Sequence, residues 1–169
     1  MNINLLSADF KIRKLDKNDV DIIYNLSSKN KIFYQYHPPF VTKESIEEDI
    51  EALPPNKSVK DKYYMGFFDN EILVAVMDLI LSYPVEDTAF IGLFIMNVEY
   101  QNKGIGSNII DDVCNRLKKI GFSKIRIGVD KGNPQSNNFW IKNSFHIISE
   151  NKYTIMEREL WIAGLGVAV

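Results

Sequence analysis

Two glycines one residue apart, Gly104 and Gly106, lie in the stretch QNKGIGS, where an apolar run gives way to a helix-like pattern. The first backbone N–H groups of a helix have no partner within it, and the helix dipole places roughly half a positive charge there. Glycine lets a ligand approach this backbone closely and permits positive φ angles. The pattern therefore predicts an anion site suited to phosphate. The alternative is a tight turn that uses glycine for its conformation alone.

Two common nucleotide motifs are excluded at this position. A dinucleotide fingerprint requires a third glycine where the chain has Ile109, and an acid about 20 residues further on, where the chain reads KIRI. A P-loop requires Lys and then Ser or Thr after its second glycine. Here Lys103 precedes Gly104 and Ile105 follows it. The phosphate ligand is therefore not bound in either of these two ways.

The elements around the glycines follow from the spacing of apolar residues. Alternating or continuous apolar runs predict strands at 10–15, 62–68, 72–81, 88–98, 124–130, 144–149 and 153–160. Helical spacing and capping residues predict helices within 16–28, 42–53, 105–121 and 133–143, and the aromatic, proline-containing segment 29–42 is a loop or a broken helix. One helix separates strands 88–98 and 124–130, so the right-handed crossover rule makes them parallel neighbours. The remaining pairings are antiparallel, which indicates an α+β sheet.

Two segments together resemble a known family. The residues QNKGIG, 101–106, resemble the Q/R-x-x-G-x-G/A signature of the GNAT superfamily of N-acetyltransferases, which also follows a long apolar strand and opens the central helix. Downstream, NPQSNNFWIKNSF (133–145) is similar to the N-x-x-A/S-x-x-F/L-Y-x-x-x-G-F segment of that family. The order of strands also agrees, so the resemblance covers nearly the whole chain. It implies one N-acetyltransferase domain over 1–169 with the GNAT fold, α/β/α in layers. That fold is a mixed, mostly antiparallel seven-stranded sheet with about four helices and a splayed parallel pair at the centre.

The resemblance also implies a co-substrate, acetyl-coenzyme A (acetyl-CoA). Its pyrophosphate would lie on the amides of the glycine turn, and its pantetheine arm would pair with the end of strand 88–98 like an added strand. A backbone N–H near Met96 or Asn97 would then polarise the thioester carbonyl. The residues implied in cofactor binding are Ile95, Met96, Asn97, Val98, Gln101, Asn102, Lys103, Gly104, Ile105, Gly106, Ser107, Asn133, Ser136, Phe139, Trp140 and Lys142.

The same resemblance leaves the catalytic acid and base open. Trp140 stands where the family often has a tyrosine acid, and an indole N–H donates without giving up its proton near neutral pH. The long strand before the glycines carries no acid, although the family often places a glutamate base there. Candidate bases are Asp78, Glu86 and Asp87. Asp78 interrupts an apolar strand, so it either faces outward or lines the acceptor cleft. Asn133 aligns with an asparagine near the thiol end of the cofactor, and it is otherwise a helix cap.

The acceptor side is expected at FYQYHPPF, between the first two predicted helices. Tyr34, Tyr36 and His37 are candidate substrate contacts there, or else they pack the helices together. We expect direct transfer of an acetyl group to a primary amine of a small molecule or peptide. The alternative is a non-catalytic module of the same fold that binds acyl-CoA.

Composition restricts the partners and the location. A net charge of −2 argues against a nucleic-acid partner, and no apolar run approaches the length of a membrane span. A single cysteine suits the reducing cytoplasm, and no His or Cys cluster predicts a metal site. The apolar C-terminal tail, 161–169, is a covered strand extension or a loose end, or else it contacts a membrane or a partner. Many members of the family that this chain resembles dimerise through terminal strands, so the apolar tail allows a homodimer here.

Overall fold

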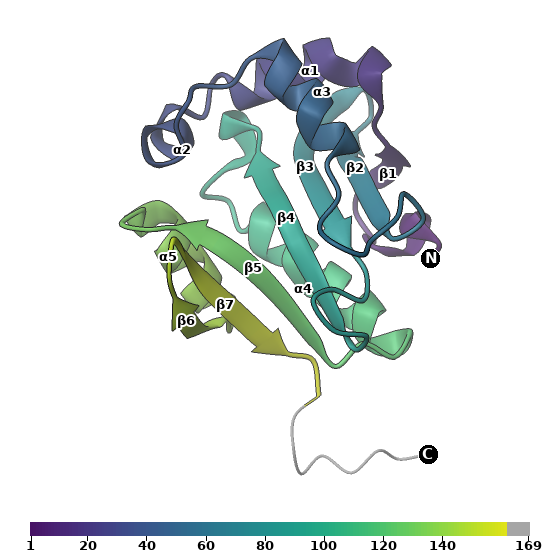
Figure 1. The fold of residues 1–169 in the computed structure, drawn as a ribbon. Coiled ribbons are helices and arrows are strands. Elements are labelled where there is room, and N and C mark those ends of the chain that lie inside the picture. The colour runs from purple at the N-terminus through teal and green to yellow at the C-terminus, as the bar shows by residue number, and fades with distance from the viewer. Residues whose placement is uncertain (162–169) are drawn as a thin grey trace.

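The structure is a computed structural model that describes residues 1–161, so the predicted tail lies outside the described residues except for Trp161 (Figure 1). Its strands are β1 (Lys11–Lys14), β2 (Lys62–Asp69), β3 (Ile72–Ile80), β4 (Thr88–Met96), β5 (Lys124–Asp130), β6 (His146–Glu150) and β7 (Tyr153–Glu159). Its α-helices are α1 (Val20–Ser27), α2 (Lys31–Tyr36), α3 (Lys43–Glu51), α4 (Ile105–Lys119) and α5 (Pro134–Lys142). The structure has one α-helix more than the four that the sequence predicts. This additional helix is α2, which lies in the segment expected to be a loop or a broken helix. No helix in this range is both long and apolar enough to cross a membrane.

The seven strands form one sheet in the order β1-β2-β3-β4-β5-β7-β6. Every neighbouring pair is antiparallel except β4 and β5, which are parallel. The predicted α+β sheet with a central parallel pair is therefore confirmed. The single crossover between β4 and β5 passes through α4, which places the N-terminus of that helix beside the end of β4 (Figure 1).

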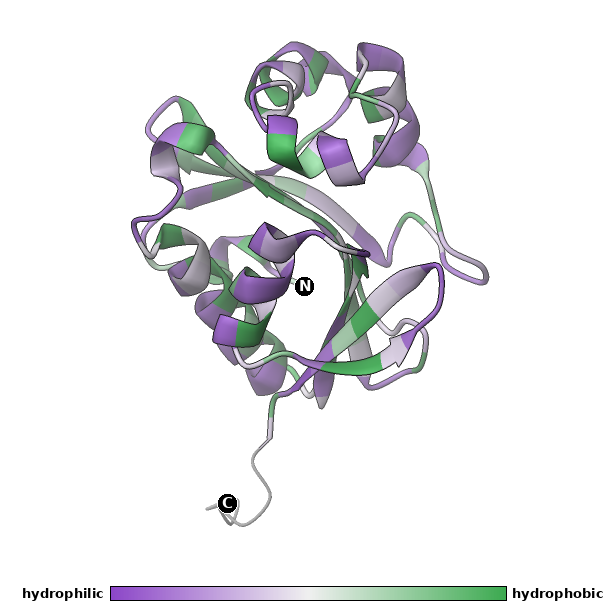
Figure 2. Cartoon of the chain, turned by 90° about the vertical axis from the view of Figure 1, so that its left-hand side faces the viewer, coloured by the Kyte–Doolittle hydropathy of each residue, from purple (hydrophilic) through white to green (hydrophobic). Residues whose placement is uncertain are grey.

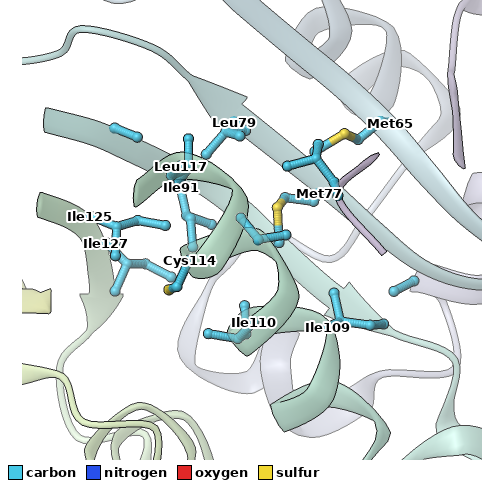
Figure 3. Close-up of a cluster of buried hydrophobic side chains, with 14 of the residues drawn as sticks. Met65, Met77, Leu79, Ile91, Ile109, Ile110, Cys114, Leu117, Ile125 and Ile127 are labelled. Atoms are coloured by element: carbon cyan, nitrogen blue, oxygen red, sulfur yellow. The ribbon is translucent and has the colours of Figure 1, made fainter. Parts of the chain in front are cut away.

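Two hydrophobic clusters attach helices to opposite faces of the sheet. On one face, α4 contributes an apolar stripe, and Figure 3 shows its side chains pointing at the strands. The stripe consists of Ile109, Ile110, Val113, Cys114 and Leu117. On the other face, α1 and α3 pack against β2, β3 and β4 through residues that include Ile23, Ile46 and Val76. Figure 2 shows the hydrophobic colour concentrated on the strands between these layers, while the helices also carry hydrophilic residues.

The parallel pair separates along its length. Pairing between β4 and β5 runs from Thr88↔Lys124 to Ile91↔Ile127, although β4 continues to Met96. The separation coincides with a β-bulge in β4, because Ile91 pairs with Leu79 while Leu93 pairs with Asp78, leaving one extra residue. That residue is Gly92. A bulge bends its strand and increases the local twist, so the end of β4 turns away from β5 and leaves a gap that points toward α2.

Candidate active site

The glycine turn forms an open cradle at the N-terminus of α4. Gly104 is the N-cap of this 15-residue helix and has a φ of 77°, in the left-handed region that favours glycine. No atom lies within 4 Å of the position that a Cβ would take there, so the backbone faces open space. Gly106 differs, because its Cβ would lie 2.6 Å from the Met96 sulfur and 3.1 Å from the Phe139 ring. Gly104 therefore exposes the amides, and Gly106 lets α4 approach β4 and α5 closely.

A cavity of about 540 Å³ extends from this cradle along the end of β4 toward α5, a size typical of ligand pockets. Residues expected to bind the cofactor that do line it are Ile95, Met96, Gln101, Asn102, Gly104, Gly106, Ser107, Ser136, Phe139, Trp140 and Lys142. Residues expected there that do not line it are Asn97, Val98, Lys103, Ile105 and Asn133. Lining residues that the sequence did not indicate are Asn30, Phe33, Phe94, Gln135 and Asn138. The cradle and the cavity are continuous, which suits an elongated molecule with an anionic group at one end.

Strand register decides which backbone groups face the gap between β4 and β5. The N–H of Asn97 donates to the carbonyl of Val74 on β3, at 2.8 Å. Backbone groups along an antiparallel strand alternate in direction, so those of Met96 and Phe94 point away from β3, toward the gap. The expectation that the Asn97 N–H could polarise a ligand carbonyl is therefore wrong. Of the two amides considered, only that of Met96 has the required direction.

Gln101, the first residue of the signature, joins the cradle to the α1–α2 junction. Its side-chain amide donates to Asn30 Oδ1 at 2.8 Å and to the Met96 carbonyl at 3.2 Å. The buried Asn30 side chain donates to the same carbonyl at 2.9 Å and to the Leu26 carbonyl at 3.0 Å. The Met96 carbonyl thus accepts two hydrogen bonds, and the start of α2 is attached to the end of β4.

The aromatic residues of α5 form one wall of the cavity. Phe94 packs against Phe139 and Trp140 with ring centroids 5.9 and 6.0 Å apart, and Trp140 also contacts Phe145 at 4.9 Å. Trp140 is buried. At the position where the related segment often has tyrosine, this chain therefore has a buried packing residue in the cavity wall.

Asn133 caps helix α5. Its Oδ1 accepts the backbone N–H of Ser136 at 3.2 Å, and its Nδ2 donates to the Ser136 hydroxyl at 3.1 Å. The residue is almost fully buried and does not line the cavity. Lys103 likewise turns away from the cradle and donates to the Glu99 carbonyl at 2.7 Å. Both side chains therefore form hydrogen bonds with residues that are close to them in the chain.

Helix α2 reaches from the end of β4 to the end of β5. After its attachment through Asn30, its C-cap residue His37 contacts the Asp130 carboxylate through Nδ1 at 2.9 Å. Phe33, rather than the three residues expected to contact substrate, lines the cavity. Tyr34 packs between Phe33 and Phe40, and burial raises the pKa of its hydroxyl to about 12. The Tyr36 ring lies beside residue 132, near the end of β5. Because it is attached at the ends of both strands, α2 covers the open end of the gap between β4 and β5 (the split).

Asp78 is buried, so the expectation that it faces outward is wrong, and it does not line the cavity described above. Its carboxylate is buried on the face of the sheet covered by α3, where Lys62 Nζ lies 2.9 Å from Oδ2. Burial raises the pKa of Asp78, and the hydrogen bond and charge of Lys62 oppose that shift. Asp87 and Glu86 lie at the opposite end of β4, where the Asp87 carbonyl accepts the backbone N–H of Ser123. These two acids are therefore remote from the cradle.

The family model of the GNAT acetyltransferases matches residues 23–145, which is more than half of the chain. The chain belongs to the GNAT acetyltransferase family. The fold agrees with solved GNAT structures. The PaiA N-acetyltransferase of Thermoplasma acidophilum, solved with coenzyme A, has a TM-score of 0.67 at 21% identity, covering 89% of this chain and 98% of that one. An acetyltransferase from Thermus thermophilus gives 0.74 at 17% identity, covering 92% and 98%.

A variant of the spermidine N-acetyltransferase SpeG from Vibrio cholerae gives a TM-score of 0.64 at 18% identity, covering 91% of this chain and 95% of that one. A search of curated protein sequences gave no significant match. At these identities, the solved structures establish the GNAT fold and leave the acceptor open. Within residues 1–161, no group of three or more His, Cys, Asp or Glu is placed to hold a metal ion.

Proposed function

We propose that this GNAT protein is an N-acetyltransferase that moves the acetyl group of acetyl-CoA to a primary amine of a small molecule or peptide. The observation that carries the proposal is the continuity of two features. A glycine cradle at the N-terminus of α4 opens into a cavity along the end of β4, where the backbone of Met96 and Phe94 faces the gap. Acetyl-CoA has the matching parts, a pyrophosphate followed by an arm that carries amide groups.

The residues present fit that molecule. The amides from Lys103 to Ser107 would hold the pyrophosphate through the helix dipole, and Lys142 lies on the cavity wall as a second positive group. The Met96 N–H faces the gap and would stabilise negative charge on a carbonyl oxygen. Acetyl-CoA, when bound, supplies an activated acetyl group as a thioester. Asn133 would act only indirectly, through the α5 helix that it caps.

The acceptor would enter beneath α2. Tyr34, Tyr36 and His37 are proposed to form the entrance, because α2 covers the open end of the split and is held at Asn30 and Asp130. One structural relative above is a spermidine N-acetyltransferase, which supports an amine acceptor for this chain as well. Another was solved with coenzyme A, which supports acetyl-CoA as the co-substrate. The location that we propose is the cytoplasm, where acetyl-CoA is available.

The test is release of coenzyme A thiol. Purified protein is mixed with acetyl-CoA and a panel that contains spermidine, tyramine and a peptide with a free N-terminus, and a thiol-reactive chromogen reports turnover. Turnover of at least one amine supports the proposal. The buried Trp140 and the acid-free β4 favour a second candidate, a non-catalytic acyl-CoA-binding module. Tight binding of acetyl-CoA in calorimetry without turnover on any amine would establish that module and overturn the enzyme.

A homodimer is proposed at the β6 edge of the sheet. Ile147 and Ile148 on this edge strand are largely exposed, as is Ile141 on the neighbouring α5. The strand is irregular between Ile147 and Ser149, and a bulge at an edge opposes strand addition, so side-chain packing is the expected contact. Light scattering after size exclusion should give twice the monomer mass, and Ile147→Lys should return the protein to a monomer.

A further inference from the structure

A row that begins with two polar residues, Tyr64 and Asp78, crosses the sheet toward the point where β4 leaves β5. The register pairs Tyr64 on β2 with Asp78 on β3, and Asp78 with Leu93 on β4. Residues opposite each other in neighbouring strands are about 5 Å apart on the same face. The bulged Gly92 stands next to Leu93 and directly after the last β4–β5 pair, Ile91↔Ile127. The row therefore ends at the inner end of the split.

Because Gly92 has no side chain, the Asp78 carboxylate can lie close to that end of the split. A Cβ on Gly92 would lie 2.8 Å from Asp78 Oδ2 and 3.3 Å from its Cγ, so the carboxylate lies where a β4 side chain would begin. Gly92 is exposed, whereas Asp78 is 9% exposed. The bare backbone of Gly92 is thus the thin cover between a buried acid and the split. Strand β4 has no acidic residue of its own, and the carboxylate beside it comes from β3.

The two oxygens of Asp78 have different surroundings. Oδ2 accepts from Lys62 Nζ, which also donates to the carbonyls of Asp49 and Ala52 and is held in place by them. Oδ1 is buried and has no hydrogen-bond partner within residues 1–161, and neither has the Tyr64 hydroxyl beside it. A buried carboxylate oxygen without a partner costs free energy unless it serves a ligand or a proton. The charged and titratable groups facing Asp78 are Lys62 and Tyr64 from β2 and Asp49 from α3.

We propose that Asp78 is the general base of the acetyl transfer, delivered from β3 beside Gly92, and that Lys62 is the positioning residue that keeps it ionised. This inference rests on the proposed N-acetyltransferase function. The amine nitrogen forms a bond to the thioester carbonyl carbon and the carbon–sulfur bond breaks. The proton lost by the nitrogen goes to Asp78 Oδ1, directly or through one water, and the sulfur leaves as the thiolate, which takes a proton from solvent.

The test combines turnover, binding and direct titration. Asp78→Asn should lower kcat by roughly 10²- to 10⁴-fold on any amine that the wild type acetylates, while the Kd for coenzyme A stays within about threefold of the wild-type value. Gly92→Ala, whose methyl group would displace the carboxylate, should also lower kcat by at least tenfold. Because a buried Lys62 without its partner endangers folding, the double variant Lys62→Met/Asp78→Leu is measured too. It replaces the pair by apolar side chains and should also lose turnover.

Lys62 has its own readout, which a purely structural role would not change. Its positive charge favours ionised Asp78, so Lys62→Met should raise the pKa of Asp78. In a plot of kcat/KM against pH, the acid limb should then move to higher pH by about one unit. Lys62→Arg, which keeps the positive charge, should return the limb to its wild-type position. A matched control is Lys57→Met, which removes a partly buried lysine paired with Asp61 elsewhere. It should leave the limb in place.

The outcomes separate this inference from the proposed function. If the wild type acetylates no amine, the proposed function fails and the inference falls with it. If the wild type is active and Asp78→Asn retains its kcat and its acid limb, only the inference is overturned. Carbon-13 NMR of the labelled Asp78 carboxyl gives a measurement without an acceptor. A titration midpoint that Lys62→Met does not raise would also overturn the inference.

Discussion

The glycine at the start of α4 can be tested against a matched glycine at the end of the same helix. Gly104 has a φ of 77° and Gly121 a φ of 102°, both are exposed, and neither has an atom within 4 Å of its Cβ position. A side chain at either position forces a left-handed conformation that costs about 1–2 kcal/mol. Both Gly104→Glu and Gly121→Glu should therefore lower the midpoint of thermal unfolding by roughly 2–8 °C.

Only the first of these variants should lose coenzyme A. A glutamate carboxylate about 6 Å from one phosphate charge, at an effective dielectric constant of about 20, is repelled by about 3 kcal/mol. That energy corresponds to a loss of roughly 100-fold in affinity. Calorimetric titration with coenzyme A at fixed ionic strength measures it. The cradle assignment is refuted if Gly104→Glu binds within threefold of the wild type, or if Gly121→Glu loses as much affinity as Gly104→Glu.

Three other features lead to predictions that need only stability or reactivity measurements. Gly106→Ala should lower the free energy of unfolding by about 1–3 kcal/mol, since its methyl group would press on the Met96 sulfur; denaturant titration checks this, and an unchanged midpoint would contradict it. Arg13 makes two hydrogen bonds to Asp19 and lowers the pKa of that carboxyl, so this contribution is present above about pH 4 and is lost as pH falls through the lowered value. Asp19→Asn should accordingly be less stable than the wild type at pH 7, and this deficit should shrink as the pH falls below about 4. A deficit that does not change with pH in thermal scans would count against the ion pair. Burial raises the pKa of the Cys114 thiol to about 11, so iodoacetamide at pH 8 should modify it only after denaturation, and rapid labelling of the native protein would contradict its burial.

Much of the cofactor side could be predicted because its determinants are local. Gly104 at a strand–helix junction needs no distant residue to expose its amides. The apolar spacing of α4 and the single helix between β4 and β5 likewise follow from short stretches and one handedness rule. The signature-like segments then supplied the family, which the match over residues 23–145 confirms.

The catalytic side depended on pairings that the sequence does not specify. Whether Met96 or Asn97 faces the gap is a question of register parity, since a shift by one residue exchanges the two directions. The burial of Asp78 depends on Lys62 reaching it from a position two residues away from its direct partner in β2, and on α3 covering both. In the same way, Phe94 lines the cavity only because the bulge at Gly92 separates β4 from β5.

By itself, therefore, the sequence determined a glycine turn that opens a helix, an α+β order of elements and membership of an acetyltransferase family. Each of these depends on neighbouring residues or on a rule of chain handedness. Only the tertiary structure decided that α2 connects the ends of β4 and β5 through Asn30 and His37, and that a carboxylate from β3 lies against Gly92 of β4. Those contacts join residues that are distant in the chain, and burial and register across the sheet, rather than local propensity, select them.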